Sequence, residues 1–277
     1  METLKILIPT DFSVQVEYAY IMVQKLAAKI NVDVHFLHVL SVPDTVSMDA
    51  EGRISTCGEI DVKYIEQQVS IANRNLLSLK SHYGEAIQTH LQLGKVTDTI
   101  IQFATEQHFD LIVMGTKGAW GIKEKVSGTE TQMIARKSQV PLLSLMCDRS
   151  DLAINHLLLV HDFSSPKAEN LTLMHKILNA FNPTLHLLQI VSGEKSTNTD
   201  SIEANMKQFA SFNCIDKFEC HVISDTDVEN GVIHFNQMHN MDMICIGTHG
   251  KGGILHQSAM EKMVNHLFKP IISFQLK

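Results

Sequence analysis

The sequence predicts an α/β protein made of two tandem domains, each with an open, mostly parallel sheet, whose sheets pair through their last strands. Three observations predict this architecture. Short apolar segments of strand length alternate with longer segments of helical periodicity, the pattern begins again after residue 151, and one apolar segment in each half runs into a glycine-containing loop. The 277 residues are enough for two domains, which we place at residues 1–147 and 152–277.

The first half opens with a strand, a helix and a second strand. The apolar segment 4–8 stops at Pro9, because proline donates no ladder hydrogen bond. Apolar residues then recur at helical spacing from residue 16 to residue 30, and an apolar strand returns at 32–40. Two strands joined in this way should be parallel, with a right-handed crossover.

The rest of the first half follows the same alternation. Residues 41–58 are polar and aperiodic, so we expect a loop there. The elements predicted after it are a helix at 61–79, a strand at 86–91, a helix at 96–106, a strand at 110–114, a helix at 129–137 and a closing strand at 140–145.

The second half repeats the first. Residues 156–164 align with residues 5–13, which makes Asp162 the counterpart of Asp11 at an offset of 151. Residues 243–250 align with 111–118 at an offset of 132, so 19 residues (151 minus 132) are missing from the second copy. We expect most of that loss in the counterpart of the 41–58 loop.

The last strands of the two halves also correspond. Residues 269–274 align with 140–145, and both segments are apolar. An exposed apolar strand at the edge of a sheet favours association with other chains. We therefore expect these two strands to pair with each other, antiparallel, within one chain. A homodimer of the whole chain is also compatible with the sequence.

A loop with three glycines follows the strand predicted at 110–114. Gly115, Gly118 and Gly128 have the spacing G-x2-G-x9-G, and Thr129 and a helix come next. Glycine lets the backbone approach a ligand, and the unpaired N–H groups at a helix start attract an anion. The spacing indicates a phosphate-binding loop, with an ordinary strand–loop–helix crossover as the alternative.

The corresponding loop of the second half is degenerate. Gly247 and Gly250 match the first two glycines, but the same spacing then reaches Met260 and Glu261 instead of a glycine and a threonine. We therefore expect phosphate binding in the first half only.

Composition disfavours several classes of function. The net charge of −7 and the pI near 6.1 give no basic surface for nucleic acid, and no apolar stretch is long enough to cross a membrane. Five cysteines without C-x-x-C spacing suit reduced thiols, and we expect a cytoplasmic protein. The 15 histidines look scattered, and His35 and His38 should face opposite sides of a strand, so we expect no metal site.

Both halves carry a strand that ends in x-Asp and a Gly-Thr-x-Gly after a later strand, and the first half adds G-x2-G-x9-G-T. In these motifs the chain resembles a tandem universal stress protein over nearly its whole length. The resemblance implies a Rossmann-like, adenine-nucleotide alpha hydrolase-like fold that binds ATP or a related nucleotide (ADP or AMP).

The resemblance also implies roles for single residues. Asp11 would contact the adenine or its ribose, Pro9 and Thr10 would shape that pocket, and Val39 would meet the base through its backbone. The residues that would line the ribose and phosphates are Met114, Gly115, Gly118, Gly128, Thr129 and Glu130.

Two of these residues have alternative interpretations. Asp11 could instead cap the first helix, a role for which Ser13 competes. Glu130 complements the helix dipole but would repel a phosphate, a repulsion that Lys117, Lys123 and Lys125 of the same loop could offset. Asp11 and Glu130 could also hold Mg²⁺ on the phosphates.

Catalysis has little support in the sequence. There is no Walker-type G-x4-G-K-[ST] motif, and no Ser-His-Asp or Cys-His set follows from the spacing. We therefore favour a nucleotide-sensing regulatory protein whose state a protein partner reads. The alternatives are an interaction scaffold that binds no nucleotide and a slow ATPase.

Overall fold

The computed structural model describes residues 3–49, 51–57, 60–116, 130–192, 199–249 and 267–276. The first half of the chain contributes β1 (Leu4–Pro9), α1 (Val14–Ala27), β2 (Val32–Ser41), β3 (Val46–Met48), β4 (Ile54–Thr56), α2 (Val62–Tyr83), β5 (Gln88–Gly94), α3 (Val96–Glu106), β6 (Leu111–Gly115), α4 (Glu130–Lys137) and β7 (Leu142–Leu145). The second half contributes β8 (His156–Val160), α5 (Thr172–Phe181), β9 (Thr184–Ser192), α6 (Thr199–Phe212), β10 (Glu219–Asp225), α7 (Val228–His239), β11 (Met243–His249) and β12 (Ile271–Leu276).

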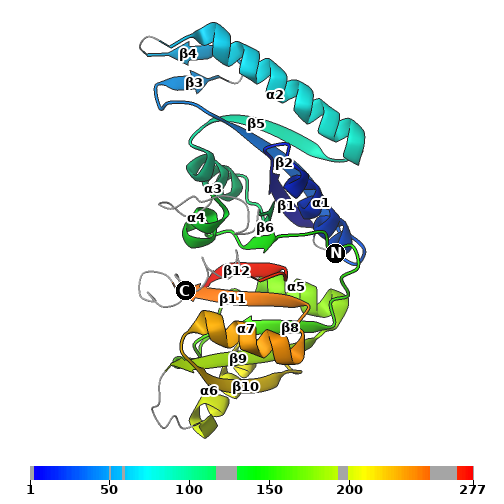
Figure 1. Ribbon diagram of the computed structural model, residues 1–277, viewed down its shortest axis with the longest axis vertical. Coiled ribbons are helices and arrows are strands. Elements are labelled where there is room, and N and C mark those ends of the chain that lie inside the picture. Colours follow the sequence, from blue (N-terminus) through cyan, green and yellow to red (C-terminus); the bar gives the residue numbers. More distant parts are fainter. Residues whose placement is uncertain are drawn as a thin grey trace.

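Ten of these strands form one continuous sheet, in the order β10-β9-β8-β11-β12-β7-β6-β1-β2-β5. The strands stack along the long axis of the molecule, the first half above the second in Figure 1. Neighbouring strands are parallel except at the junction of the halves, where β12 and β7 are antiparallel and Ile272 lies opposite Leu143. The predicted α/β class is confirmed, and the closing strands pair with each other as expected.

Helices cover both faces of the sheet, and each face has its own apolar layer. Side chains of α1, α5 and α6 pack on one face, around buried residues such as Met22, Phe163 and Phe209. Side chains of α3, α4 and α7 pack on the other, around Ile100 and Phe235. Each fully buried side chain of this size stabilises the fold by about 1.5–3 kcal/mol. Because both layers contain residues of both halves, the packing follows the continuous sheet.

The described elements of the second half recur in the same order as those of the first. In each half a β-α-β unit comes first, and its two strands are parallel neighbours. The second half is shorter than the first at two places. The connection from β9 to α6 is shorter than that from β2 to α2, as expected, and α6 has 14 residues where α2 has 22.

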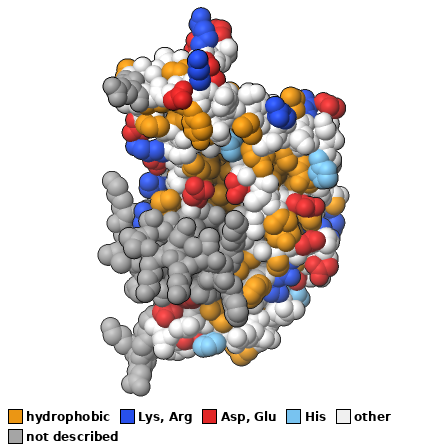
Figure 2. Space-filling model, turned by 45° about the horizontal axis from the view of Figure 1, so that its top comes forward, with side chains coloured by type: hydrophobic (Ala, Val, Ile, Leu, Met, Phe, Trp, Pro, Cys, Tyr) orange, Lys and Arg blue, Asp and Glu red, His pale blue; other side chains and the backbone are white. Residues whose placement is uncertain are grey.

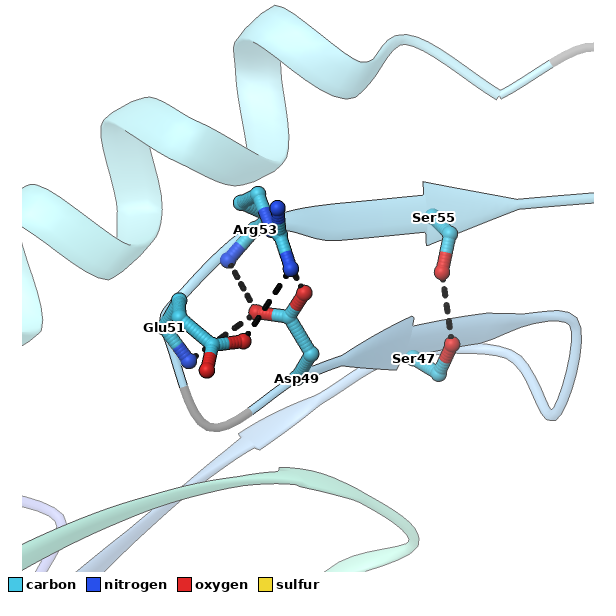
Figure 3. A network of polar contacts seen from close by, with 5 residues as sticks. All are labelled: Ser47, Asp49, Glu51, Arg53 and Ser55. Atoms are coloured by element: carbon cyan, nitrogen blue, oxygen red, sulfur yellow. Dashed lines mark hydrogen bonds and ion pairs between the residues drawn. The ribbon is translucent and has the colours of Figure 1, made fainter.

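The loop predicted at residues 41–58 is partly wrong, because β3 and β4 pair there as an antiparallel hairpin. Figure 3 shows what closes it: the Asp49 carboxylate accepts hydrogen bonds from the backbone N–H groups of Glu51 and Arg53 and from Arg53 Nε, at 2.7–3.1 Å. Further along, the hydroxyls of Ser47 and Ser55 are 2.9 Å apart. β3 and β4 have three residues each, which is too short for an alternation of apolar and polar residues that would predict a strand.

Other boundaries differ by a few residues. The first strand includes Pro9, which lies opposite Leu37 as the last residue of the ladder, so its missing N–H costs no interior pairing. The helix predicted at 61–79 begins after Asp61, whose carboxylate accepts from Lys63 N and Tyr64 N, and it continues to Tyr83.

Candidate nucleotide-binding site

Several predicted site residues meet at one edge of the first-half sheet. β6, β1 and β2 are neighbours, and Gly115, Pro9 and Val39 lie at or near their carboxyl ends. β1 lies between β2, the next strand of the main sheet along the chain, and β6, a later strand. The connections that leave β1 and β6 therefore run in opposite directions along the sheet, and the switch point lies between these two strands. Ligands of open α/β sheets bind outside the carboxyl ends of the strands at such a point.

The turn between β1 and α1 holds Asp11 at this edge. Asp11 Oδ1 accepts a hydrogen bond of 3.0 Å from Ser13 N, and Thr10 Oγ1 accepts one of 3.0 Å from Phe12 N. Ser13 is the N-cap of α1, and its side chain makes no capping hydrogen bond. Neither Asp11 nor Ser13 therefore caps α1 through its side chain. Asp11 instead bonds the backbone of the N-cap residue Ser13, and its side chain stays exposed.

Phe12 has a left-handed backbone, with φ of 63°. This conformation is costly for a bulky residue and needs support from its surroundings. His38 on β2 gives that support, since its ring lies 4.5 Å from the Phe12 ring and its Nδ1 is 2.8 Å from the carbonyl oxygen of Thr10. Backbone strain is thus held in the segment that carries Asp11. No sequence motif indicates this role of His38, because it depends on a contact between β2 and the turn after β1.

Gly115 is needed for close packing between β6 and α1. A Cβ atom at Gly115 would lie 2.0 Å from the carbonyl oxygen of Gln15, a backbone atom that cannot turn away. The glycine spacing predicted close approach of the backbone to a ligand, whereas the described contact is with α1, and Gly115 is not among the described residues with positive φ. Its small size lets the first turn of α1 reach the strand end.

Two polar atoms beside this contact are buried. Gln15 Oε1 and Thr116 Oγ1 have no hydrogen-bond partner among the described residues. Buried polar groups are nearly always hydrogen-bonded in proteins. Both atoms are therefore candidates to bond a ligand or the loop that follows Thr116. Thr116 belongs to the Gly-Thr-x-Gly motif, which was the signal available in the sequence, whereas nothing in the sequence indicated Gln15.

Two carboxylates of the predicted site influence each other. Partial burial raises the pKa of the Glu130 carboxyl, and the Asp11 carboxylate raises it further, although Glu130 is exposed as a residue. Two neighbouring carboxylates repel each other unless a proton or a cation lies between them. Carboxylate oxygens are ligands that Mg²⁺ prefers, so Asp11 and Glu130 are the candidate metal ligands at this edge.

The structure places seven of the ten predicted residues. Thr10, Val39 and Met114 are buried, and Pro9, Asp11, Gly115 and Glu130 are intermediate or exposed. Gly118, Gly128 and Thr129 lie outside the described residues, as do Met260 and Glu261 of the second loop.

The second half repeats the hydrogen bonds of this turn at the corresponding place, although Phe163, the counterpart of Phe12, is not among the described residues with positive φ. Asp162 Oδ1 accepts a hydrogen bond of 3.0 Å from Ser164 N, as Asp11 does from Ser13 N. The N–H of the preceding residue bonds the neighbouring strand in both halves, from Thr10 to Leu37 O and from His161 to Leu188 O. Asp11 and Asp162 are therefore a matched pair for mutagenesis.

Charge and cysteine chemistry agree with the sequence. Acidic and basic side chains are interspersed on the face drawn in Figure 2, with no continuous basic field among the coloured residues. All five cysteines are free thiols. Within the described ranges, no helix is both long enough and apolar enough to cross a membrane.

The expectation of scattered histidines is wrong. His35 and His38 do contact different groups, but His35 pairs with His90 across two strands. In the second half, His186, Glu219 and His221 come together closely enough to hold a metal ion. Sequence spacing could not predict either group, because neighbouring strands bring together residues that are tens of positions apart.

Comparisons with known proteins agree on one family. The model of the universal stress protein family matches residues 2–145. Two universal stress proteins of Methanocaldococcus jannaschii are 28% and 24% identical over 140 and 149 residues, alignments that cover 50% of this chain and 79% and 92% of those proteins. The crystal structure of a universal stress protein from Archaeoglobus fulgidus aligns with a TM-score of 0.70 at 17% identity and covers 98% of each chain, so the whole-chain fold is shared.

Proposed function

We propose that this chain, which belongs to the universal stress protein family, is a regulatory module that binds ATP, ADP or AMP in its first half only. The observation that carries the proposal is the meeting of Asp11, Val39 and Gly115 at the strand ends where the chain order reverses. The glycine loop that follows β6 in the sequence supplies the phosphate-binding backbone.

We also propose that residues 1–147 and 152–277 are two universal stress protein domains. The repeated element order and the matched turns at Asp11 and Asp162 support this division. Nucleotide binding is one-sided because the second loop has Met260 and Glu261 in place of the last glycine and threonine. Without that glycine, the loop cannot wrap a polyphosphate in the same way.

The groups at this edge suggest how a nucleotide is held. Pro9 and Thr10 shape the adenine pocket, Val39 meets the base through its backbone, and the Asp11 carboxylate accepts hydrogen bonds from the base or the ribose. Gln15 Oε1 and Thr116 Oγ1 are buried acceptors that a ligand hydroxyl would satisfy. With a triphosphate, Asp11 and Glu130 would hold Mg²⁺, which neutralises phosphate charge.

Binding, rather than catalysis, is the proposed role. The sequence supplies carboxylates and glycines at the site but no nucleophile–base pair, so hydrolysis is expected to be slow at most. Occupancy by the nucleotide would change a surface that a protein partner reads.

The test compares two equivalent aspartates. Isothermal calorimetry and the fluorescence of Trp120, the single tryptophan, would follow the titration of the full chain with ATP and MgCl₂. Asp11→Asn should weaken binding by about 10–100-fold, because hydrogen bonds to a charged group contribute about 1.5–3 kcal/mol. Asp162→Asn, at the same turn of the second half, should leave the affinity unchanged.

A second pair of variants tests the loops. Gly128→Leu should abolish binding, and Gly253→Leu in the second loop should not. No heat and no fluorescence change for the wild type would overturn the proposal and leave the interaction scaffold as the better description. Equal loss in Asp11→Asn and Asp162→Asn would overturn the one-sided binding, and steady phosphate release above a buffer blank would favour the slow ATPase.

A further inference from the structure

Three ligating side chains gather on the outer strands of the second half. His186 lies on β9, and Glu219 and His221 lie on β10, the strand at the edge of the sheet. Glu219 is directly opposite His186 in the parallel ladder, and His221 is opposite Leu188. The three side chains share the face that α7 covers, where the Phe235 ring lies 4.8 Å from the His221 ring.

The separations between the three ligand atoms are those of a coordination sphere. His186 Nδ1 is 3.0 Å from His221 Nε2 and 3.4 Å from Glu219 Oε2, and His221 Nε2 is 3.7 Å from Glu219 Oε2. Ligands about 2.0–2.1 Å from a tetrahedral zinc ion are separated by about 3.3 Å. We propose that His186, Glu219 and His221 form a site for a divalent transition metal ion, with Zn²⁺ as the expected occupant.

A second residue orients the most buried ligand. His156 Nδ1 is 3.2 Å from His186 Nε2, so a proton on His186 Nε2 would leave Nδ1 free to bind metal. Metal-binding histidines almost always donate their other N–H to such a partner, which fixes the ring and its tautomer. His156 therefore acts as a positioning residue.

The site is closed on one side and open on the other. The His186 side chain is 6% exposed, that of His221 19% and that of Glu219 57%. A closed structural zinc site uses four protein ligands, whereas three ligands leave a position for water or an external group. Two imidazoles and a carboxylate suit Zn²⁺, and Ni²⁺ and Cu²⁺ also accept this set. The bound ion would fasten β10, an edge strand, to β9.

The first half contains a natural counterpart that lacks the carboxylate. His35 and His90 take the places of His186 and His221, with His35 Nδ1 2.9 Å from His90 Nε2, but Gln88 stands opposite His35 where Glu219 stands opposite His186. Asp33 Oδ2 lies 3.0 Å from the other nitrogen, His35 Nε2. Lys5 replaces His156 by the sequence alignment. Among the described residues, the first half therefore offers no third ligand on the metal side, and the cationic Lys5 is present instead.

Without a metal, His186 and His221 would simply share a hydrogen bond, and this alternative can be tested. The full chain would be stripped with a chelator and titrated with ZnCl₂ in a calorimeter, and with CoCl₂ to record the visible absorption of a low-symmetry cobalt site. We expect one ion per chain. Zn²⁺ should also raise the unfolding temperature, because it binds the folded state.

The key variant is Glu219→Gln, because glutamine is the residue that the first half has at the equivalent position, Gln88. It is close to isosteric at an exposed position, so it should fold, which circular dichroism would check. It should lower the Zn²⁺ affinity by about tenfold or more, and His221→Gln by about 100-fold. His90→Gln, the matched change in the first half, should leave the affinity and stoichiometry unchanged. Absence of heat and of cobalt absorption in the wild type would overturn the proposal, as would equal affinity in Glu219→Gln.

Discussion

At the scale of single residues, the strongest steric constraint at the candidate site is the contact of Gly115 with α1. Gly115→Ala should lower the free energy of unfolding by about 1–3 kcal/mol, because the new Cβ meets the backbone carbonyl of Gln15 and overpacking forces the helix away. Urea denaturation followed by circular dichroism would measure the change.

Gly231 on α7 provides the control for this substitution. The three atoms nearest to a Cβ there all belong to the side chain of Ile190 and not to backbone, and alanine gains about 1 kcal/mol over glycine inside a helix. Gly231→Ala should therefore cost less stability than Gly115→Ala. If Gly115→Ala cost no more than Gly231→Ala, close packing would not explain the glycine at the end of β6.

His90 makes stability depend on pH. Burial lowers the pKa of His90, and His35 and Lys5 lower it further, so the folded chain takes up this proton less readily than the unfolded chain. Stability is therefore lost as the pH falls below the ordinary histidine pKa of about 6.5, and it is fully present above that value. We expect the free energy of unfolding to decrease from pH 7.5 to pH 5.5, and His90→Gln to make that decrease smaller.

The control for this titration is His82→Gln, which changes an exposed histidine at the end of α2. Urea denaturation at three pH values would compare both variants with the wild type. The interpretation would fail if His82→Gln reduced the pH dependence as much as His90→Gln.

At the scale of elements, the sequence predicted what apolar periodicity can encode. The helices and strands of the main sheet follow from runs of buried side chains, such as those at Leu7 and Ile112. The β3–β4 hairpin was missed because its fold depends on the polar contacts of Asp49. In the candidate site, motifs identified Asp11 and Gly115, whereas Gln15 was found only through the packing of a helix on a strand.

The hairpin also provides a test of how a polar residue shapes an element. Asp49→Ala removes the acceptor for the backbone N–H groups of Glu51 and Arg53, so hydrogen exchange at these two amides should accelerate. Global stability should change little, because the contacts are exposed. Amide exchange measured by NMR would report both results.

Ser47→Ala is the matched variant, since it removes the hydroxyl contact with Ser55 and leaves the turn intact. Exchange at the Glu51 and Arg53 amides should stay at the wild-type rate. Unchanged exchange in Asp49→Ala would mean that the turn is held by the β3–β4 ladder alone.

At the scale of the whole molecule, the junction of β7 and β12 joins two repeated halves into one sheet. Ser144 Oγ donates to Ile271 O and Ser273 Oγ donates to Leu142 O, both at 3.4 Å, so the two strands exchange equivalent contacts across the junction. Buried side chains on both faces continue from one half into the other. We infer that the two halves unfold as one cooperative unit.

Cys245 can report on this coupling, because it lies in the second half and is the one buried residue among the five free cysteines. Burial raises the pKa of its thiol to about 12, so the native chain should react very slowly with a disulfide reagent. In a chain whose other four cysteines are replaced by serine, the labelling rate would then measure how often the second half opens.

Leu143→Ala, on β7 of the first half, should accelerate the labelling of Cys245 on β11 of the second half. The substitution removes a fully buried side chain at the junction and should cost about 2–5 kcal/mol, which corresponds to labelling at least about 30-fold faster if the halves open together. Leu77→Ala, at an exposed position of α2, should change neither stability nor labelling. If Leu143→Ala lowered the unfolding midpoint by circular dichroism while Cys245 kept its wild-type labelling rate, the halves would unfold independently despite their shared sheet.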